Sequence, residues 1–252
     1  MPKRPLDSGC LVTGPDGLAF EQAGPLRWAR VVGADDGARM LSLFYAEADP
    51  GKGPEIACGD SEAVLFLLSG RCTLAIGGRA FSVQPHSGAY VGRGESFHFE
   101  VPAAGPRARW LLCVCPQRNA LDVAGAPSKR FDEALPGRVV AASGQRREAT
   151  GERYFKLLVG PQTGSREVTQ FIGMIPRSRA AEHFHTYEEV ICVLSGDGRL
   201  WAGAESAPVG PGSMIFLPRR QPHSLECTSA EGMELVGMFY PAGSPAVNYP
   251  TT

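Results

Sequence analysis

The sequence repeats itself at half its length, and this repeat limits the folds that the chain can adopt. The segment VLFLLSGRCTL, residues 64–74, aligns with VICVLSGDGRL, residues 190–200, at an offset of 126 residues, and five of the eleven positions are identical. Three further pairs keep the same offset: Gly77 with Gly203, Val83 with Val209, and Pro85 with Pro211. Because a constant offset is typical of duplication, each half of the chain is predicted to contain the same supersecondary unit.

Both halves contain short segments rich in β-branched and aromatic residues, separated by glycine and proline. Examples are Ala75–Val83 and Ser213–Leu217. Such spacing is typical of an all-β sandwich or barrel, and long helical periodicity is absent. The sequence therefore predicts an all-β fold with two tandem barrels. The expected divisions are an N-terminal segment at 1–34, a first barrel at 35–118, a connector at 119–149, a second barrel at 150–245 and a C-terminal tail at 246–252.

The composition is typical of a soluble globular protein, with 43% hydrophobic residues in a chain of 252. The net charge is -1 and basic residues occur only in pairs such as Lys3-Arg4, so neither a nucleic acid nor an anionic membrane is indicated as a partner. No segment approaches the roughly 20 apolar residues of a membrane span, and Met1–Phe20 lacks an apolar stretch of signal-peptide length. A cytoplasmic location is expected, with the seven cysteines reduced.

Metal-donor side chains stand at alternate positions of the run His183-Phe184-His185-Thr186-Tyr187-Glu188-Glu189. In an extended chain, alternate side chains point to the same face, so the two histidines, Tyr187 and Glu189 are expected to project together. His223 follows Glu189 by 34 residues and is expected to join them from another strand. Three imidazoles and a carboxylate form a mixed nitrogen and oxygen set that suits a first-row transition metal.

These residues resemble the two motifs of the cupin superfamily. The first motif, G-x5-H-x-H-x3,4-E-x6-G, is matched by His183, His185, Glu189 and Gly196, and the second, G-x5-P-x-G-x2-H-x3-N, by Gly212, Pro218 and His223. The chain departs from these motifs at Arg177, Arg220 and Cys227, and none of these three positions is that of a metal ligand. The resemblance implies a bicupin, with two double-stranded β-helix (jelly-roll-like) barrels. It also implies one divalent transition metal, Mn, Fe, Ni, Zn or Cu, with the ligands His183, His185, Glu189 and His223.

Alignment of the two halves indicates that only the second half keeps this ligand set. The positions that correspond to its first three ligands are Ala57, Gly59 and Ala63, and only His98 remains, opposite His223 after a one-residue insertion. The first barrel is therefore predicted to be metal-free. Its expected roles are to cover sheet edges of the second barrel, to form the interface of a homodimer, or to shape the mouth of the pocket.

The interior of a barrel is lined by alternate residues of each strand, so the ligands are expected inside a pocket. Tyr187 is the candidate catalytic residue, because it shares the face of the ligands and its hydroxyl can orient a substrate or handle a proton. The other candidate pocket residues are Gln170 or Phe171, Ile191, Val193, Met214, Phe216 and Phe239.

In its layout, with a metal in the second barrel only, the chain is similar to the (S)-ureidoglycine aminohydrolases of bacteria and plants. Glu62 and the stretches 88–91 and 109–127 carry this likeness in the first half. That family has Glu, His, His and Gln as its ligands, and the different set found here argues against the same substrate.

Three functions remain open on the sequence. The first is a metal-dependent enzyme that acts on a small polar metabolite by Lewis-acid chemistry, as a hydrolase, isomerase or decarboxylase. The second is a metal-dependent dioxygenase similar to the quercetin-cleaving bicupins, which would stop without oxygen. The third is a protein that binds a small molecule or a sugar without catalysis.

Overall fold

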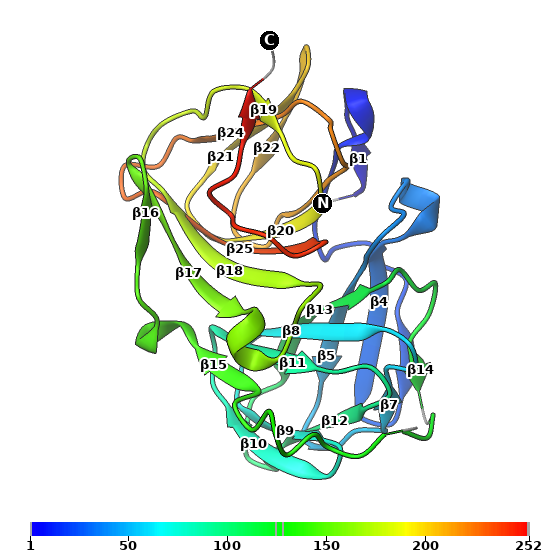
Figure 1. The fold of residues 1–252 in the computed structure, drawn as a ribbon. Coiled ribbons are helices and arrows are strands. Elements are labelled where there is room, and N and C mark those ends of the chain that lie inside the picture. The colour runs from blue at the N-terminus through cyan, green and yellow to red at the C-terminus, as the bar shows by residue number, and fades with distance from the viewer. Residues whose placement is uncertain (1, 124, 128, 251–252) are drawn as a thin grey trace.

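The computed structural model describes residues 2–123, 125–127 and 129–250. These residues form 26 short strands and four 3-10 helices, and no α-helix occurs among them. The strands build two barrels, with the first half of the chain in the lower part of Figure 1 and the second half in the upper part. The prediction of an all-β fold with two tandem barrels is thus confirmed. None of the helices that the structure describes is long and apolar enough to cross a membrane.

The first barrel is a seven-stranded sheet that faces a six-stranded one. Its strands are β3 (Glu21–Ala23), β4 (Leu26–Val32), β5 (Ser42–Ala48), β6 (Gly51–Lys52), β7 (Ile56–Ala57), β8 (Glu62–Ser69), β9 (Cys72–Ile76), β10 (Arg79–Val83), β11 (Ser87–Val91), β12 (Ser96–Val101), β13 (Ala108–Cys115), β14 (Asp122–Val123) and β15 (Val139–Ala141). The larger sheet has the order β15-β11-β8-β13-β5-β4-β3. The smaller has the order β10-β9-β12-β7-β14, with β6 paired to β12.

The second barrel repeats this plan with an eight-stranded sheet and a three-stranded one. Its strands are β16 (Glu148–Thr150), β17 (Arg153–Val159), β18 (Thr169–Ile175), β19 (His183–Phe184), β20 (Glu188–Ser195), β21 (Gly198–Ala202), β22 (Glu205–Val209), β23 (Met214–Leu217), β24 (Ser224–Cys227), β25 (Met233–Tyr240) and β26 (Tyr249–Pro250), joined by β1 (Arg4–Pro5) and β2 (Leu11–Thr13). The larger sheet has the order β1-β2-β23-β20-β25-β18-β17-β16, and the smaller has the order β22-β21-β24. A separate pair is formed by β19 and β26.

Corresponding elements of the two halves extend further than the sequence repeat. The strands β8, β9 and β10 match β20, β21 and β22 at the predicted offset, whereas upstream the offset grows by one residue. There the 3-10 helices η2 (Ala34–Asp36) and η4 (Pro161–Thr163) each end at a left-handed glycine, Gly37 (φ 86°) and Gly164 (φ 97°). The hairpin β3–β4 therefore belongs to the first barrel, although the sequence predicts that residues 1–34 lie outside it. Because the offset changes by one residue, an alignment at the constant offset of 126 does not detect this part of the repeat.

Each repeat contributes its leading strand to the large sheet of the other repeat. β2 pairs with β23, where Leu11 lies opposite Phe216, and β15 pairs with β11, where Ala141 lies opposite Ser87. In Figure 1, β1 accordingly lies beside the upper barrel and β15 beside the lower one. Without these partners β11 and β23 would expose unpaired N–H and C=O groups. The N-terminal segment, rather than the first barrel itself, thus covers a sheet edge of the second barrel.

The described residues form three hydrophobic cores, one inside each barrel and one between the two large sheets. The large sheet of the second barrel is therefore buried on both faces. On β20, Val190 and Cys192 belong to the core between the barrels, whereas Ile191 and Val193 belong to the core inside the second barrel. Burial of a large apolar side chain stabilises a fold by about 1.5–3 kcal/mol, so the middle core holds the barrels together.

The interior of the first barrel is filled by aromatic side chains. Phe99 stacks on Trp110 with ring centroids 4.7 Å apart and contacts Phe97 edge-on at 5.6 Å. His98 pairs through Nδ1 with the Glu55 carboxylate at 2.7 Å. Across the described residues, the one cluster of three metal donors lies in the second barrel.

Candidate metal centre

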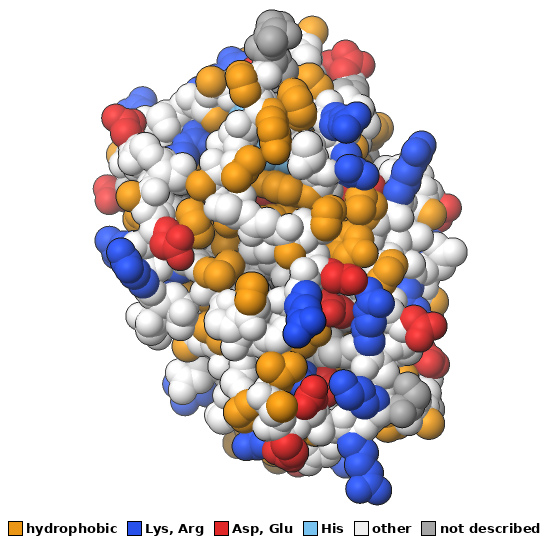
Figure 2. Space-filling model, viewed as in Figure 1, with side chains coloured by type: hydrophobic (Ala, Val, Ile, Leu, Met, Phe, Trp, Pro, Cys, Tyr) orange, Lys and Arg blue, Asp and Glu red, His pale blue; other side chains and the backbone are white. Residues whose placement is uncertain are grey.

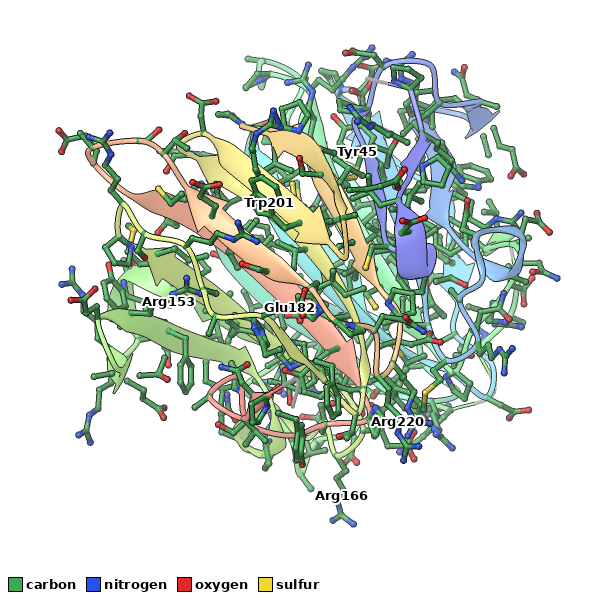
Figure 3. The ribbon with its side chains drawn as sticks, turned by 90° about the horizontal axis from the view of Figure 1, so that it is seen from above. Tyr45, Arg153, Arg166, Glu182, Trp201 and Arg220 are labelled. Atoms are coloured by element: carbon green, nitrogen blue, oxygen red, sulfur yellow. The ribbon has the colours of Figure 1, made fainter. Side chains whose placement is uncertain are left out.

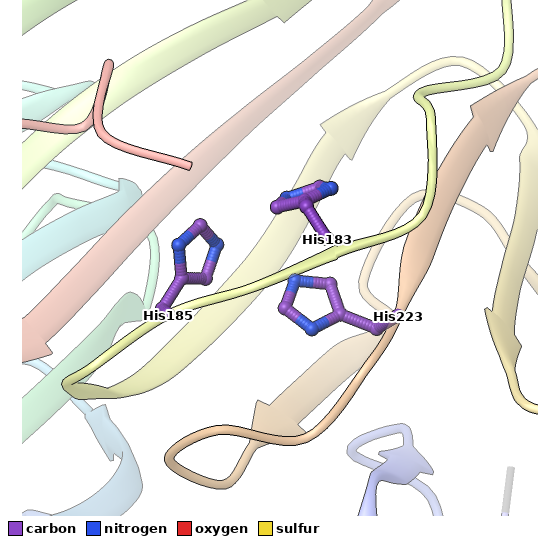
Figure 4. Close-up of side chains that lie close together, drawn as sticks. All are labelled: His183, His185 and His223. Atoms are coloured by element: carbon purple, nitrogen blue, oxygen red, sulfur yellow. The ribbon is translucent and has the colours of Figure 1, made fainter. Parts of the chain in front are cut away.

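Three histidines converge inside the second barrel (Figure 4). His183 and His223 lie directly opposite each other: the N–H of His183 donates to the carbonyl of His223 (3.0 Å), and the N–H of His223 donates to the carbonyl of His183 (2.9 Å). Opposed residues point their side chains to the same face, and these two rings are 4.6 Å apart. The ring of His185, two residues further along, lies 4.9 Å from both.

Each imidazole is oriented by a backbone carbonyl that accepts from its Nδ1. The Nδ1-to-oxygen distances are 2.8 Å from His183 to Ala181, 2.9 Å from His223 to Gln221, and 3.3 Å from His185 to Val247. Because a carbonyl only accepts, Nδ1 carries the proton and Nε2 keeps its lone pair. Metal-binding histidines are typically held in this way. One ligand atom from each ring lies within 4.8 Å of the other two.

Glu189 places a carboxylate beside His185, next to the cluster that the three imidazoles form. Residues 185–187 separate β19 from β20, so the motif is not one continuous strand, but Glu189 still points into the barrel. Its Oε2 lies 3.5 Å from Nε2 of His185, and the residue is only 4% exposed. Burial raises the pKa of Glu189 to about 8. A nearby cation would stabilise this buried carboxylate, so the donor set fits a divalent metal.

The histidines are in the protonation state that a metal requires. Burial lowers the pKa of His185 to about 3 and that of His223 to about 4, and the neighbouring histidines act in the same direction. Burial also lowers the pKa of His183. All three imidazoles are therefore neutral at neutral pH and can donate a lone pair.

The donors line a cavity of about 400 Å³ inside the second barrel. Its walls are mostly apolar, with Phe171 and Ile191 from the predicted set and Phe155, Leu217 and Leu235 besides. Gly237 makes room for the Phe171 ring, because a Cβ there would lie 2.4 Å from it. Figure 2 shows hydrophobic side chains gathered over the upper and middle part of one face of the molecule. The small polar metabolite expected from the sequence stays a prediction, and the apolar walls also suit a ligand with an apolar part.

Five of the residues predicted to line the pocket do not line it. Gln170, Met214 and Phe216 point to the other face of the sheet, towards the first barrel. Gln170 is fully buried there, and its Nε2 donates to the Leu65 carbonyl at 3.2 Å. The remaining two, Val193 and Phe239, pack in the barrel core behind the side chains that line the cavity.

Tyr187 lies between a metal donor and the barrel core. Its ring stacks on His185 at 4.6 Å and on Phe239 at 4.0 Å, with interplanar angles of 11° and 17°. It lines the cavity, and burial together with the nearby Glu189 raises the pKa of its phenol. The phenol therefore stays protonated and can donate a hydrogen bond to a ligand.

The first barrel holds the start of β20 in place. The buried Glu188 carboxylate accepts from the backbone N–H of Arg39 (2.9 Å) and of Met40 (2.8 Å). Since Glu189 is the next residue, this contact positions the strand that carries the acidic donor.

Two parts of the cavity wall have no motif that could reveal them in the sequence. Arg153 on β17 lines the cavity from the strand pair β16–β17 (Figure 3), and burial lowers the pKa of its guanidinium. The C-terminal segment pairs with β19 through β26 and supplies Val247, whose carbonyl orients His185. Both segments lie far from the histidines along the chain, and only the fold brings them close.

Comparisons with known proteins agree with this architecture. Residues 170–239 match the family model for the Cupin domain. The chain is similar in structure to a serine-to-alanine variant of Bacillus subtilis oxalate decarboxylase, with a TM-score of 0.73 and 12% identity over 92% of this chain and 78% of that one. It is also similar to a structure of the Bacillus subtilis enzyme described for its Mn(II) centres, with a TM-score of 0.71, 12% identity and the same coverage. No curated protein matches the sequence.

Proposed function

Since residues 170–239 form a cupin domain and the chain has the two-barrel fold of a bicupin, we propose that this protein is a metal-dependent enzyme with its active site in the second barrel. The observation that supports this proposal is the convergence of three imidazoles, each with Nδ1 engaged by a backbone carbonyl, beside a buried carboxylate. Nε2 of His183, His185 and His223 and the carboxylate of Glu189 would hold one divalent metal.

Manganese is the first metal to test. The donor set also suits iron, nickel, zinc and copper. Among the structural relatives is an enzyme described with Mn(II) centres, and this supports manganese as the starting choice.

The proposed chemistry is non-oxidative and takes place on a small-molecule substrate. A metal in this site would supply Lewis-acid polarisation of a substrate oxygen, which serves hydrolysis, isomerisation and decarboxylation. The protonated phenol of Tyr187 lines the same cavity and can orient that substrate by a hydrogen bond. The structural relatives are decarboxylases, which supports testing decarboxylation first, and an aminohydrolase reaction on ureidoglycine stays a hypothesis.

The metal content of two matched variants tests the proposal. His223→Ala removes a proposed ligand, whereas His98→Ala changes the corresponding residue of the first barrel, which pairs with Glu55. After loading with Mn(II) and desalting, elemental analysis should find one manganese per chain in the wild type and in His98→Ala, and almost none in His223→Ala. Circular dichroism would verify that both variants fold. Equal manganese content in the two variants would contradict the proposal.

A further inference from the structure

Arg153 places a positive charge inside the cavity, which Glu182 and Glu189 also line, and it forms no ion pair within the described part of the chain. The residue begins β17 and is partly buried, and its Nη2 donates to the Leu225 carbonyl at 3.5 Å. Among residues 2–123, 125–127 and 129–250, no carboxylate forms an ion pair with it. Other arginines of the chain do have such partners, for example Arg138 with Glu95 and Arg107 with Asp49. A partly buried charge without a partner is unfavourable, so a ligand that supplies the missing anion would be stabilised here.

The position of Arg153 relative to the histidines is set by β24. Leu225, whose carbonyl accepts from the guanidinium, follows His223 by two residues on an extended segment, a separation of about 7 Å. Both Leu225 and His223 line the cavity together with Arg153. A ligand a few bonds long could therefore contact the metal centre with one end and Arg153 with the other.

The rest of the wall favours an apolar body between these two ends. Phe155 lies two residues after Arg153 on the same face of β17, and its ring meets Phe171 edge-on at 6.3 Å. Ile191 and Leu235 line the same space. A cavity of about 400 Å³ falls within the range of small-molecule sites, and it is much larger than a ligand of a few atoms requires.

We infer that the cavity binds a monocarboxylate with an aromatic or aliphatic body, whose carboxylate pairs with Arg153. The planar guanidinium offers two parallel N–H donors, which match the two oxygens of a carboxylate. The inference rests on the proposed function, which makes this cavity the substrate site, and it adds the chemical class of the substrate.

Isothermal titration with a charged probe and its neutral counterpart tests the inference. The probes are 3-phenylpropanoate and 3-phenylpropanamide, which differ in charge and share the same body. Titrations are run on metal-free and on manganese-loaded protein, so that binding of the carboxylate by the metal is separated from binding by Arg153. In metal-free wild type, the acid should bind about tenfold to a hundredfold more tightly than the amide, as is typical of a charge-assisted bidentate contact.

Two variants complete the test. Arg153→Gln should reduce the preference for the acid to a ratio near one, and Arg146→Gln, which removes an exposed arginine outside the cavity, should keep it. Equal affinity of the wild type for the two probes, no measurable binding of the acid, or an unchanged preference in Arg153→Gln would each overturn the inference. If the wild type binds no manganese but still prefers the acid, the proposed function is overturned and the inference about Arg153 stands.

Discussion

Replacement of Arg138 by methionine should destabilise the first barrel far more than removal of its whole ion pair. The side chains of Arg138 and Glu95 are each 1% exposed, and two hydrogen bonds of 2.7 and 2.8 Å join them. The Glu95 carboxylate also accepts from the backbone N–H of Gly92 (2.8 Å) and of Asp132 (3.1 Å). This pair fixes the connector to the barrel immediately before β15, the strand that completes its large sheet.

The expected magnitude follows from burial. Arg138→Met leaves the Glu95 carboxylate buried without a counter-charge, which costs about 3–5 kcal/mol in the free energy of unfolding. The double variant Glu95→Gln with Arg138→Met removes both charges, and its single amide oxygen can still accept from one of the two backbone donors, Gly92 or Asp132. It should therefore be more stable than Arg138→Met alone.

The pH dependence has a definite sign. Burial alone would raise the pKa of Glu95, but the Arg138 guanidinium outweighs it and holds the pKa below the usual value. The pair thus stabilises the wild type above the pKa of an unfolded glutamate, roughly 4.3, and this contribution is lost as the pH falls through the lower folded pKa. In Arg138→Met the carboxylate can take up a proton, so the penalty should be largest near pH 7 and smallest near pH 4.

Tryptophan fluorescence can follow the first barrel by itself. Trp28 and Trp110 are buried in its core, and the third tryptophan, Trp201, lies in the second barrel. Urea titrations in a Trp201→Phe background, at pH 7 and at pH 4, would give the free energy of unfolding of each variant. A loss below about 1 kcal/mol in Arg138→Met at pH 7, or a double variant no more stable than the single one, would refute the reasoning.

Two further predictions concern the segments next to the metal centre. Truncation after Gly243 removes the Val247 carbonyl that orients His185. The affinity for manganese, measured by competition with a chelator, should therefore fall about tenfold to a hundredfold. An unchanged affinity would contradict the proposal that Val247 orients His185 for metal binding. Arg220 has a left-handed backbone (φ 59°), which glycine adopts without strain, and Arg220→Gly keeps the backbone N–H that donates to the His185 carbonyl. The variant should therefore raise the free energy of unfolding, measured by urea titration, by roughly 0.5–1 kcal/mol. A decrease would show that the arginine side chain stabilises the fold.

Much of the architecture could be predicted from local patterns. The duplication of β8–β10 as β20–β22 was visible as a constant offset, because these strands keep the same lengths and turns in both halves. The spacing of His183, His185 and His223 predicted that the three imidazoles converge, and Glu189, the fourth predicted ligand, lies beside His185. The left-handed backbone at Arg220 explains why the cupin motif has glycine at this position, and nothing in the structure explains the arginine.

Alternation along a strand shows which residues share a face, but it does not show which face lines the cavity. The large sheet of the second barrel is buried on both sides, so its two faces are equally apolar in sequence and Gln170 could be assigned to either. Only the docking of the first barrel places Gln170 outside the pocket and Phe171 inside it. The sequence by itself determined the barrels and pointed to the three histidines that converge, because strand periodicity and motif spacing are local patterns. Tertiary structure decided the exchange of β2 and β15, the entry of Arg153 into the cavity and the support of His185 by Val247, because each depends on contacts between segments far apart in the chain.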